Sequence, residues 1–297
     1  MTTDRSDVYT RITDQIIAEL EKGVRPWLKP WNAEHAAGRI TRPLRAGGEP
    51  YKGINVLMLW MSAQAQGFAA PIWMTFNQAK GLGACVKKGA KGSLVVYANH
   101  VTKTETGDDG EEAERDIYFM KGYTVFNVEQ VEGLPAHFYA TAAPQLDPVQ
   151  RIEAADLFFA NTGADIRHGG NRAYYAGEPD TIQMPPFEAF KDAESYCATL
   201  AHELTHWTNH AGRLDRDFGR KAFGDEGYAR EELVAEIGSA FLACDLELTP
   251  EPREDHASYL DHWLKVLKED KRAIFQAAAY AQKAVDYLHG LQPKLES

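Results

Sequence analysis

Two histidines and a glutamate are spaced so that they could form a hydrolytic metal site. His202, Glu203 and His206 follow the pattern His-Glu-x-x-His within a stretch whose apolar residues recur at helical spacing. Residues four apart lie on one face of a helix, so both imidazoles can reach one ion. Glu203 is then placed to act as a general base toward a water molecule on that ion. The pattern predicts a Zn²⁺-dependent peptidase, with Mn²⁺ as the alternative metal.

The third ligand of this site is expected from a helix predicted over residues 228–246. Catalytic zinc sites usually have three protein ligands and one open position. Glu232 and Glu236 lie four residues apart beside the apolar face of that helix, and a buried acid needs a partner. By spacing alone, either carboxylate could be the ligand. The longer metzincin motif is excluded, because Asn209 and Gly212 stand where it requires Gly and His.

The pair Glu232-x-x-x-Glu236 resembles the E-x-x-x-D/E element of the gluzincin metalloproteases. In those enzymes the first carboxylate binds zinc, and the second orients a ligand histidine through its ring N–H. The resemblance implies Glu232 as the third metal ligand and Glu236 as the partner of a histidine; the alternative is Glu236 as the ligand. A hairpin over residues 173–184 is expected to supply an edge strand for an extended peptide. Three tyrosines are candidates to stabilise an oxyanion: Tyr174, Tyr175 and Tyr228.

Charge is distributed unevenly along the chain. The net charge of −11 by itself disfavours nucleic-acid binding, but residues 22–100 hold eleven basic and two acidic residues, a net +9, which leaves −20 for the rest. Aromatic residues are interleaved with these cations, among them Tyr51, Trp60, Trp73 and Phe76. Of these, Trp60 is expected in the core. Cations that meet phosphates and aromatic faces that stack on bases are typical of single-stranded DNA binding. The residues predicted to contact DNA are Trp27, Lys29, Trp31, Lys52, Lys87, Lys88 and Lys91.

The predicted elements form two α+β domains, 1–135 and 149–297, joined by a Pro- and Ala-rich linker over 136–148. The first domain is predicted to have helices at 6–22, 53–66 and 72–82, strands at 93–98, 117–119 and 123–126, and an exposed hairpin tip at 104–115. The second is predicted to have, besides the hairpin, helices at 149–161, 190–210, 228–246, 252–268 and 271–289.

The sequence indicates a globular protein without membrane contacts. No apolar run approaches the roughly 20 residues of a membrane-spanning helix, and the N-terminus lacks the pattern of a signal peptide. A cytoplasmic location is therefore expected. The three cysteines, Cys85, Cys197 and Cys244, match no metal or redox motif and are expected as buried free thiols.

The chain as a whole resembles the ArdC-type antirestriction proteins of conjugative plasmids. The segments that carry the resemblance are Pro26-Trp27, 50–55, 73–79, Lys88-Gly89, 125–130, 202–206 and 231–241. The first half is also similar to the N-terminal part of TraC-type plasmid primases. The resemblance implies an N-terminal domain that binds single-stranded DNA and a C-terminal zincin-like, gluzincin-type metallopeptidase domain.

The same resemblance implies a plasmid-encoded protein that enters the recipient cell with the transferred strand and protects it from host restriction. Our hypothesis is that DNA binding brings a metal-dependent peptidase to a protein substrate in the host restriction system. The alternative is a DNA-masking protein whose metal site is structural and cuts no peptide. A metal-dependent nuclease is disfavoured, because nuclease sites gather several carboxylates around Mg²⁺ or Mn²⁺.

Overall fold

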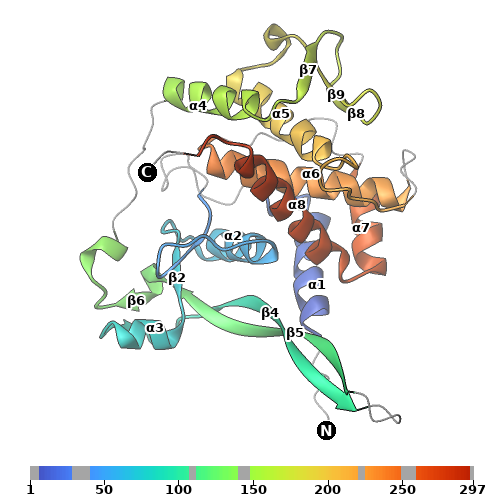
Figure 1. Ribbon diagram of the computed structural model, residues 1–297. Helices are drawn as coiled ribbons and strands as arrows, with labels where there is room; N and C mark the ends of the chain where they lie inside the picture. The colour runs from blue at the N-terminus through green and yellow to red at the C-terminus, as the bar shows by residue number, and fades with distance from the viewer. Residues whose placement is uncertain are drawn as a thin grey trace.

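The computed structural model describes residues 7–28, 41–106, 112–139, 148–219, 225–248 and 259–294. It shows an N-terminal and a C-terminal part, each with helices and strands (Figure 1). The predicted two-domain α+β fold is confirmed. The predicted linker over 136–148 stays a prediction, because residues 140–147 lie outside the described part of the chain.

The N-terminal part combines three helices with a mixed sheet. The helices are α1 (Val8–Glu21), α2 (Ile54–Gln66) and α3 (Phe76–Gly81). The sheet has the order β1 (Leu44–Arg45), β2 (Ile72–Met74), β5 (Glu112–Asn127), β4 (Ser93–Thr106). A second, two-stranded sheet pairs β3 (Cys85–Val86) with β6 (Val131–Glu132). The helix expected over 72–82 is therefore a short strand followed by α3, which begins at a capping box of Thr75 and Gln78.

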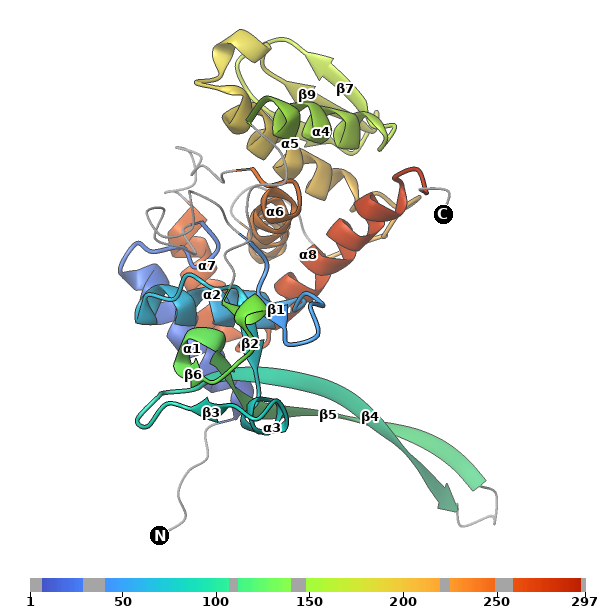
Figure 2. The same cartoon turned by 90° about the vertical axis from the view of Figure 1, so that its left-hand side faces the viewer.

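Strands β4 and β5 form a long antiparallel arm that extends away from the body of the protein (Figure 2). Their pairing runs from Ser93 with Val125 to Thr106 with Glu112. The predicted strands were too short, and the predicted hairpin tip at 104–115 was too long. The polar sequence between residues 99 and 116 lacks the apolar alternation that predicts a strand, although backbone pairing continues through it.

The C-terminal part places a small sheet beside a group of helices. The sheet has the order β7 (Asp165–His168), β9 (Thr181–Met184), β8 (Tyr174–Ala176), with β8 antiparallel to β9. The helices are α4 (Pro148–Ala160), α5 (Ala193–Trp207), α6 (Glu226–Asp245), α7 (Leu260–Glu269) and α8 (Ala273–Gly290). Strands β8 and β9 form the expected hairpin, whereas β7 was missed.

One apolar core continues from the N-terminal part into the C-terminal part. Helix α1 packs against α7, and α2 packs against α8. Trp27 meets Trp263 edge to face at 5.8 Å between ring centroids, and Trp60 meets Phe241 in the same way at 5.8 Å. Trp60 is fully buried, as expected. Either part on its own would leave these apolar side chains exposed, so their burial holds the two parts together.

Helices α5 and α6 approach each other closely, and this contact determines the geometry of the candidate site. Asp192 is the N-cap of helix α5, and its Oδ1 accepts from the Ser195 N–H at 2.8 Å. A Cβ at Gly238 of α6 would lie only 2.6 Å from the Thr205 Cγ2 of α5. Glycine at this position lets α6 come close enough for its acidic residues to reach α5.

Two further expectations can be compared with the structure. None of the helices in the described ranges combines the length and the hydropathy that a membrane span requires. All three cysteines are free thiols. Cys197 and Cys244 are buried as expected, but the prediction was wrong for Cys85, which is exposed on the short strand β3.

Candidate metal centre

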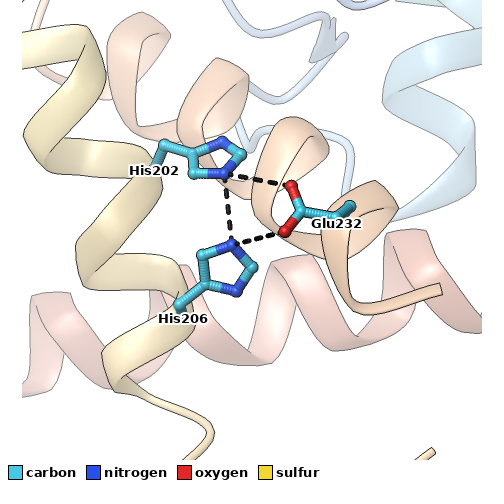
Figure 3. A group of neighbouring side chains, drawn as sticks. All are labelled: His202, His206 and Glu232. Carbon is cyan, nitrogen blue, oxygen red and sulfur yellow. Dashed lines mark hydrogen bonds and ion pairs between the residues drawn. The ribbon is translucent and has the colours of Figure 1, made fainter. Parts of the chain in front are cut away.

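His202 and His206 of α5 and Glu232 of α6 converge on one point (Figure 3). The two Nε2 atoms are 3.2 Å apart. One Glu232 oxygen lies 3.6 Å from His202 Nε2 and the other 3.5 Å from His206 Nε2. The potential ligand atoms all lie within 4.8 Å of one another, so a single ion can contact all three residues.

The chemistry of these groups fits a divalent cation. Two imidazole nitrogens and one carboxylate are a common donor set for such ions. Burial raises the pKa of Glu232, but His206 and His202 outweigh that effect and hold the pKa well below its usual range. Burial lowers the pKa of His206, but the Glu232 and Glu231 carboxylates raise it to about 10. Surroundings that favour a positive charge so strongly would also stabilise a metal ion.

Each of the two histidines has a carboxylate at its other ring nitrogen. Glu236 Oε1 lies 3.6 Å from His202 Nδ1. Glu231 Oε1 lies 3.1 Å from His206 Nδ1. Carboxylates in this place determine the tautomer and orientation of a ligand histidine. The structure thus places Glu232 on the Nε2 side of both rings and Glu236 on the far side of His202.

Glu231 and its partner Arg216 were not anticipated from the sequence. Arg216 is buried and donates to both Glu231 oxygens, from Nε at 2.8 Å and from Nη2 at 2.6 Å. It also donates to the Thr205 carbonyl at 3.0 Å and to the Thr208 hydroxyl at 3.2 Å. Burial raises the pKa of Glu231, but Arg216 and His206 bring it down to about 2. Arg216 therefore ties the end of α5 to the carboxylate that orients His206.

The three residues line a cavity of about 1420 Å³ together with Glu203, which is 3 % exposed. Tyr174 and Tyr175 of β8 also line this cavity. Among the described residues, β8 pairs with β9 alone, so β8 is an edge strand of its sheet. The predicted hairpin thus places an edge strand beside the candidate metal centre.

The three candidate tyrosines have different surroundings. Tyr174 is half exposed. The Tyr175 hydroxyl donates to Asp180 at 2.8 Å and accepts from Arg213 at 3.2 Å. The Tyr228 hydroxyl is 3.0 Å from that of Tyr259, and both residues line the cavity. Burial and the Glu232 carboxylate raise the pKa of Tyr228, so the phenol keeps its proton at neutral pH and can donate it in a hydrogen bond.

The structure corrects one of the predicted DNA contacts. Trp27 is fully buried, and its indole N–H donates to Glu236 Oε2 at 3.2 Å. The prediction that this ring stacks on a base is wrong, because it has no exposed face. Lys29 and Trp31 lie outside the described residues.

The four remaining predicted DNA contacts are exposed lysines. Lys52 forms an ion pair with Asp286 at 3.2 Å. Lys87, Lys88 and Lys91 are exposed on the turn that follows β3. Of these three, Lys87 also donates to the Glu129 carbonyl at 2.8 Å.

Comparisons with known proteins agree with the division into two parts. Residues 6–126 match the family model of the N-terminal domain of the anti-restriction factor ArdC, and residues 153–280 match that of a zincin-like metallopeptidase. The metal-free crystal structure of the antirestriction ArdC protein from the R388 plasmid is 46% identical, covers 96% of this chain and 97% of its own, and superposes with a TM-score of 0.81. The chain belongs to the ArdC antirestriction family. Its C-terminal part is accordingly zincin-like.

The other relatives of this ArdC-family chain include proteins of similar length and one much longer protein. The Mn(II)-bound structure of the R388 protein covers 96% of this chain and 98% of its own, with 46% identity and a TM-score of 0.77. The uncharacterized protein y4eC of Sinorhizobium fredii is 42% identical over 98% of this chain and 96% of its own length. A DNA primase TraC of Escherichia coli is 38% identical over 96% of this chain, which spans only 27% of the primase. The likeness to TraC therefore includes both halves of the chain and not only the first.

Proposed function

We propose that this protein protects incoming conjugative plasmid DNA from host restriction by combining single-stranded DNA binding with a metal-dependent peptidase site. The convergence of His202, His206 and Glu232 in a cavity that also holds Glu203 and an edge strand carries the proposal. Membership of the ArdC family supports the antirestriction role. The proposed metal is Zn²⁺ or Mn²⁺, and the proposed protein substrate belongs to the host restriction system.

The residues around the cavity fit peptide hydrolysis. When bound, the ion would polarise a carbonyl group and lower the pKa of a coordinated water molecule. Glu203 accepts a proton at its carboxylate and passes it to the leaving amine nitrogen. The β8 backbone pairs with an extended peptide, as edge strands do. Tyr228 donates its hydroxyl hydrogen to the developing oxyanion.

Glu203→Gln is expected to bring protection down to the level of a plasmid that lacks the protein. The amide keeps the shape of the side chain but cannot accept the proton, and general-base catalysis is worth roughly 10²–10⁴ in rate. The measurement is conjugation efficiency into restricting and non-restricting recipients, with wild type and variant expressed equally. Full protection by the variant would rule out the peptidase and leave DNA masking as the explanation.

The proposed DNA surface lies around β3 and α3. Helix α3 contacts β3, and the turn with Lys88 and Lys91 follows β3. Phe76, the first residue of α3, is 53 % exposed, so this aromatic ring is available to stack on a base. Exposed cations and an exposed ring thus lie on one part of the N-terminal half.

Lys88→Glu combined with Lys91→Glu is expected to weaken binding of a single-stranded oligonucleotide. Loss of two phosphate contacts should reduce the slope of log K against log salt by about 1.4, since each contact on a single strand contributes about 0.7. Fluorescence anisotropy at several salt concentrations measures this slope. The matched control is the pair Lys265→Glu and Lys283→Glu, which makes the same charge change on exposed residues of α7 and α8. An equal loss of oligonucleotide affinity in both double variants would contradict the assigned DNA surface.

A further inference from the structure

We infer that Arg25 and Trp27, which come from the N-terminal half, are positioning residues of the metal centre and act on His202 through Glu236. The inference rests on the metal site of the proposed function. It gives a role to the Pro26-Trp27 segment, whose tryptophan is buried and cannot stack on DNA as predicted. It also means that the N-terminal half supplies part of the surroundings of the metal site.

The contacts form a continuous chain from the N-terminal half to the ligand. The Trp27 indole N–H donates to Glu236 Oε2 at 3.2 Å, and Arg25 Nη1 lies 3.7 Å from the same oxygen. The other oxygen, Glu236 Oε1, lies 3.6 Å from His202 Nδ1. One carboxylate oxygen therefore faces the N-terminal half, and the other faces the ligand histidine.

Burial makes these contacts matter for the orientation of His202. Glu236 and His202 are both 3 % exposed, so neither group can turn toward water. A buried carboxylate is costly unless hydrogen bonds and a counter-charge compensate it. Trp27 supplies a hydrogen-bond donor and Arg25 a positive charge at Glu236 Oε2, the oxygen that faces away from His202. Removal of either group should let the carboxylate rotate away from His202.

The direction of the Trp27 hydrogen bond is held by packing. The indole has a single N–H donor. Its ring is fully buried and meets Trp263 edge to face at 5.8 Å. Trp263 in turn stacks on Tyr259, which lines the cavity of the metal centre. The aromatic contacts thus fix the N–H toward Glu236 rather than merely filling space.

This series of contacts crosses the boundary between the two regions that match family models. Arg25 and Trp27 lie within residues 6–126, which match the N-terminal domain of ArdC, and Glu236 lies within residues 153–280, which match the zincin-like domain. A purely structural tryptophan would affect only the stability of the fold. A positioning tryptophan must also affect the affinity of the site for metal.

The test compares Trp27→Phe with Trp60→Phe in the full-length protein. Trp60 is also fully buried, but its N–H donates to the Thr41 carbonyl at 3.1 Å and not to a carboxylate. Both substitutions remove one buried donor and should lower the melting temperature in EDTA. Affinities for Mn²⁺ and for Zn²⁺ are measured by calorimetry, with a competing chelator for Zn²⁺.

Trp27→Phe is expected to weaken metal binding about tenfold. This is the lower end of the roughly 10–100-fold range seen when a residue that orients a metal ligand is lost. Trp60→Phe should bind metal with wild-type affinity. Arg25→Gln, at a partly exposed residue that tolerates substitution more easily, should weaken binding in the same direction. Rescue by Arg25→Lys, which keeps the charge, supports an electrostatic role.

Two results would overturn the inference: wild-type affinity in both Trp27→Phe and Arg25→Gln, or an equal loss of affinity in Trp60→Phe. A different result concerns the proposed function alone. If Glu203→Gln protects fully while Trp27→Phe binds metal weakly, the peptidase proposal fails and the positioning role stands. A wild-type protein that takes up neither metal overturns both.

Discussion

Glu232→Ala is expected to lower the affinity for Zn²⁺ and Mn²⁺ by more than about 100-fold, beyond what loss of a group behind a ligand costs. Glu232 is the carboxylate that faces the Nε2 atoms of both histidines, at 3.6 and 3.5 Å. Without it, two imidazoles remain, and the negative charge that compensates a divalent cation at this point is lost. Calorimetric titration and metal analysis of the purified variant measure the effect.

Two variants of the same helix serve as comparisons for Glu232→Ala. Glu226→Ala removes an exposed carboxylate that pairs with Arg230, and wild-type affinity is expected. Glu236→Ala removes the carboxylate behind His202, and an intermediate loss of about 10–100-fold is expected. If Glu236→Ala instead lost more affinity than Glu232→Ala, Glu236 would be the ligand, which is the alternative that the spacing allowed.

The local part of the site could be predicted from the sequence, because helical periodicity alone determines it. His202 and His206 are four residues apart on α5, and the structure brings their Nε2 atoms to 3.2 Å. Glu232 and Glu236 are also four residues apart on α6. Their spacing cannot distinguish them, because only the packing of α6 on α5 decides which carboxylate faces Nε2 and which faces Nδ1.

The long-range part could not be predicted, since local composition was misleading there. Trp27 stands among cations, which is typical of an exposed DNA-binding segment, yet Glu236 and Trp263 enclose it from the other half of the chain. Arg216 stands in a polar loop, where an arginine is usually solvated, yet it is buried against Glu231. For Trp27 the deciding partner is 209 residues away in sequence. For Arg216 it is a glutamate, a residue type that is usually exposed.

Arg216→Met is expected to lower the free energy of unfolding by about 3–5 kcal/mol, the usual effect of removing one partner of a buried ion pair. Arg216 donates to both oxygens of Glu231, and the variant would leave that carboxylate buried without its counter-charge. Urea unfolding in EDTA measures the change without a contribution from bound metal. Arg167→Met is the matched control, because its pair with Asp165 is exposed and such pairs contribute at most about 1 kcal/mol.

A double variant separates the stabilising role of the pair from its role at the metal centre. Arg216→Met combined with Glu231→Leu replaces the buried ion pair by apolar side chains, which is often neutral for stability. We therefore expect most of the lost free energy of unfolding to return. Metal affinity should stay about 10–100-fold below wild type, because His206 Nδ1 has lost the carboxylate at 3.1 Å. Recovery of both properties would show that Glu231 stabilises the fold but does not orient His206.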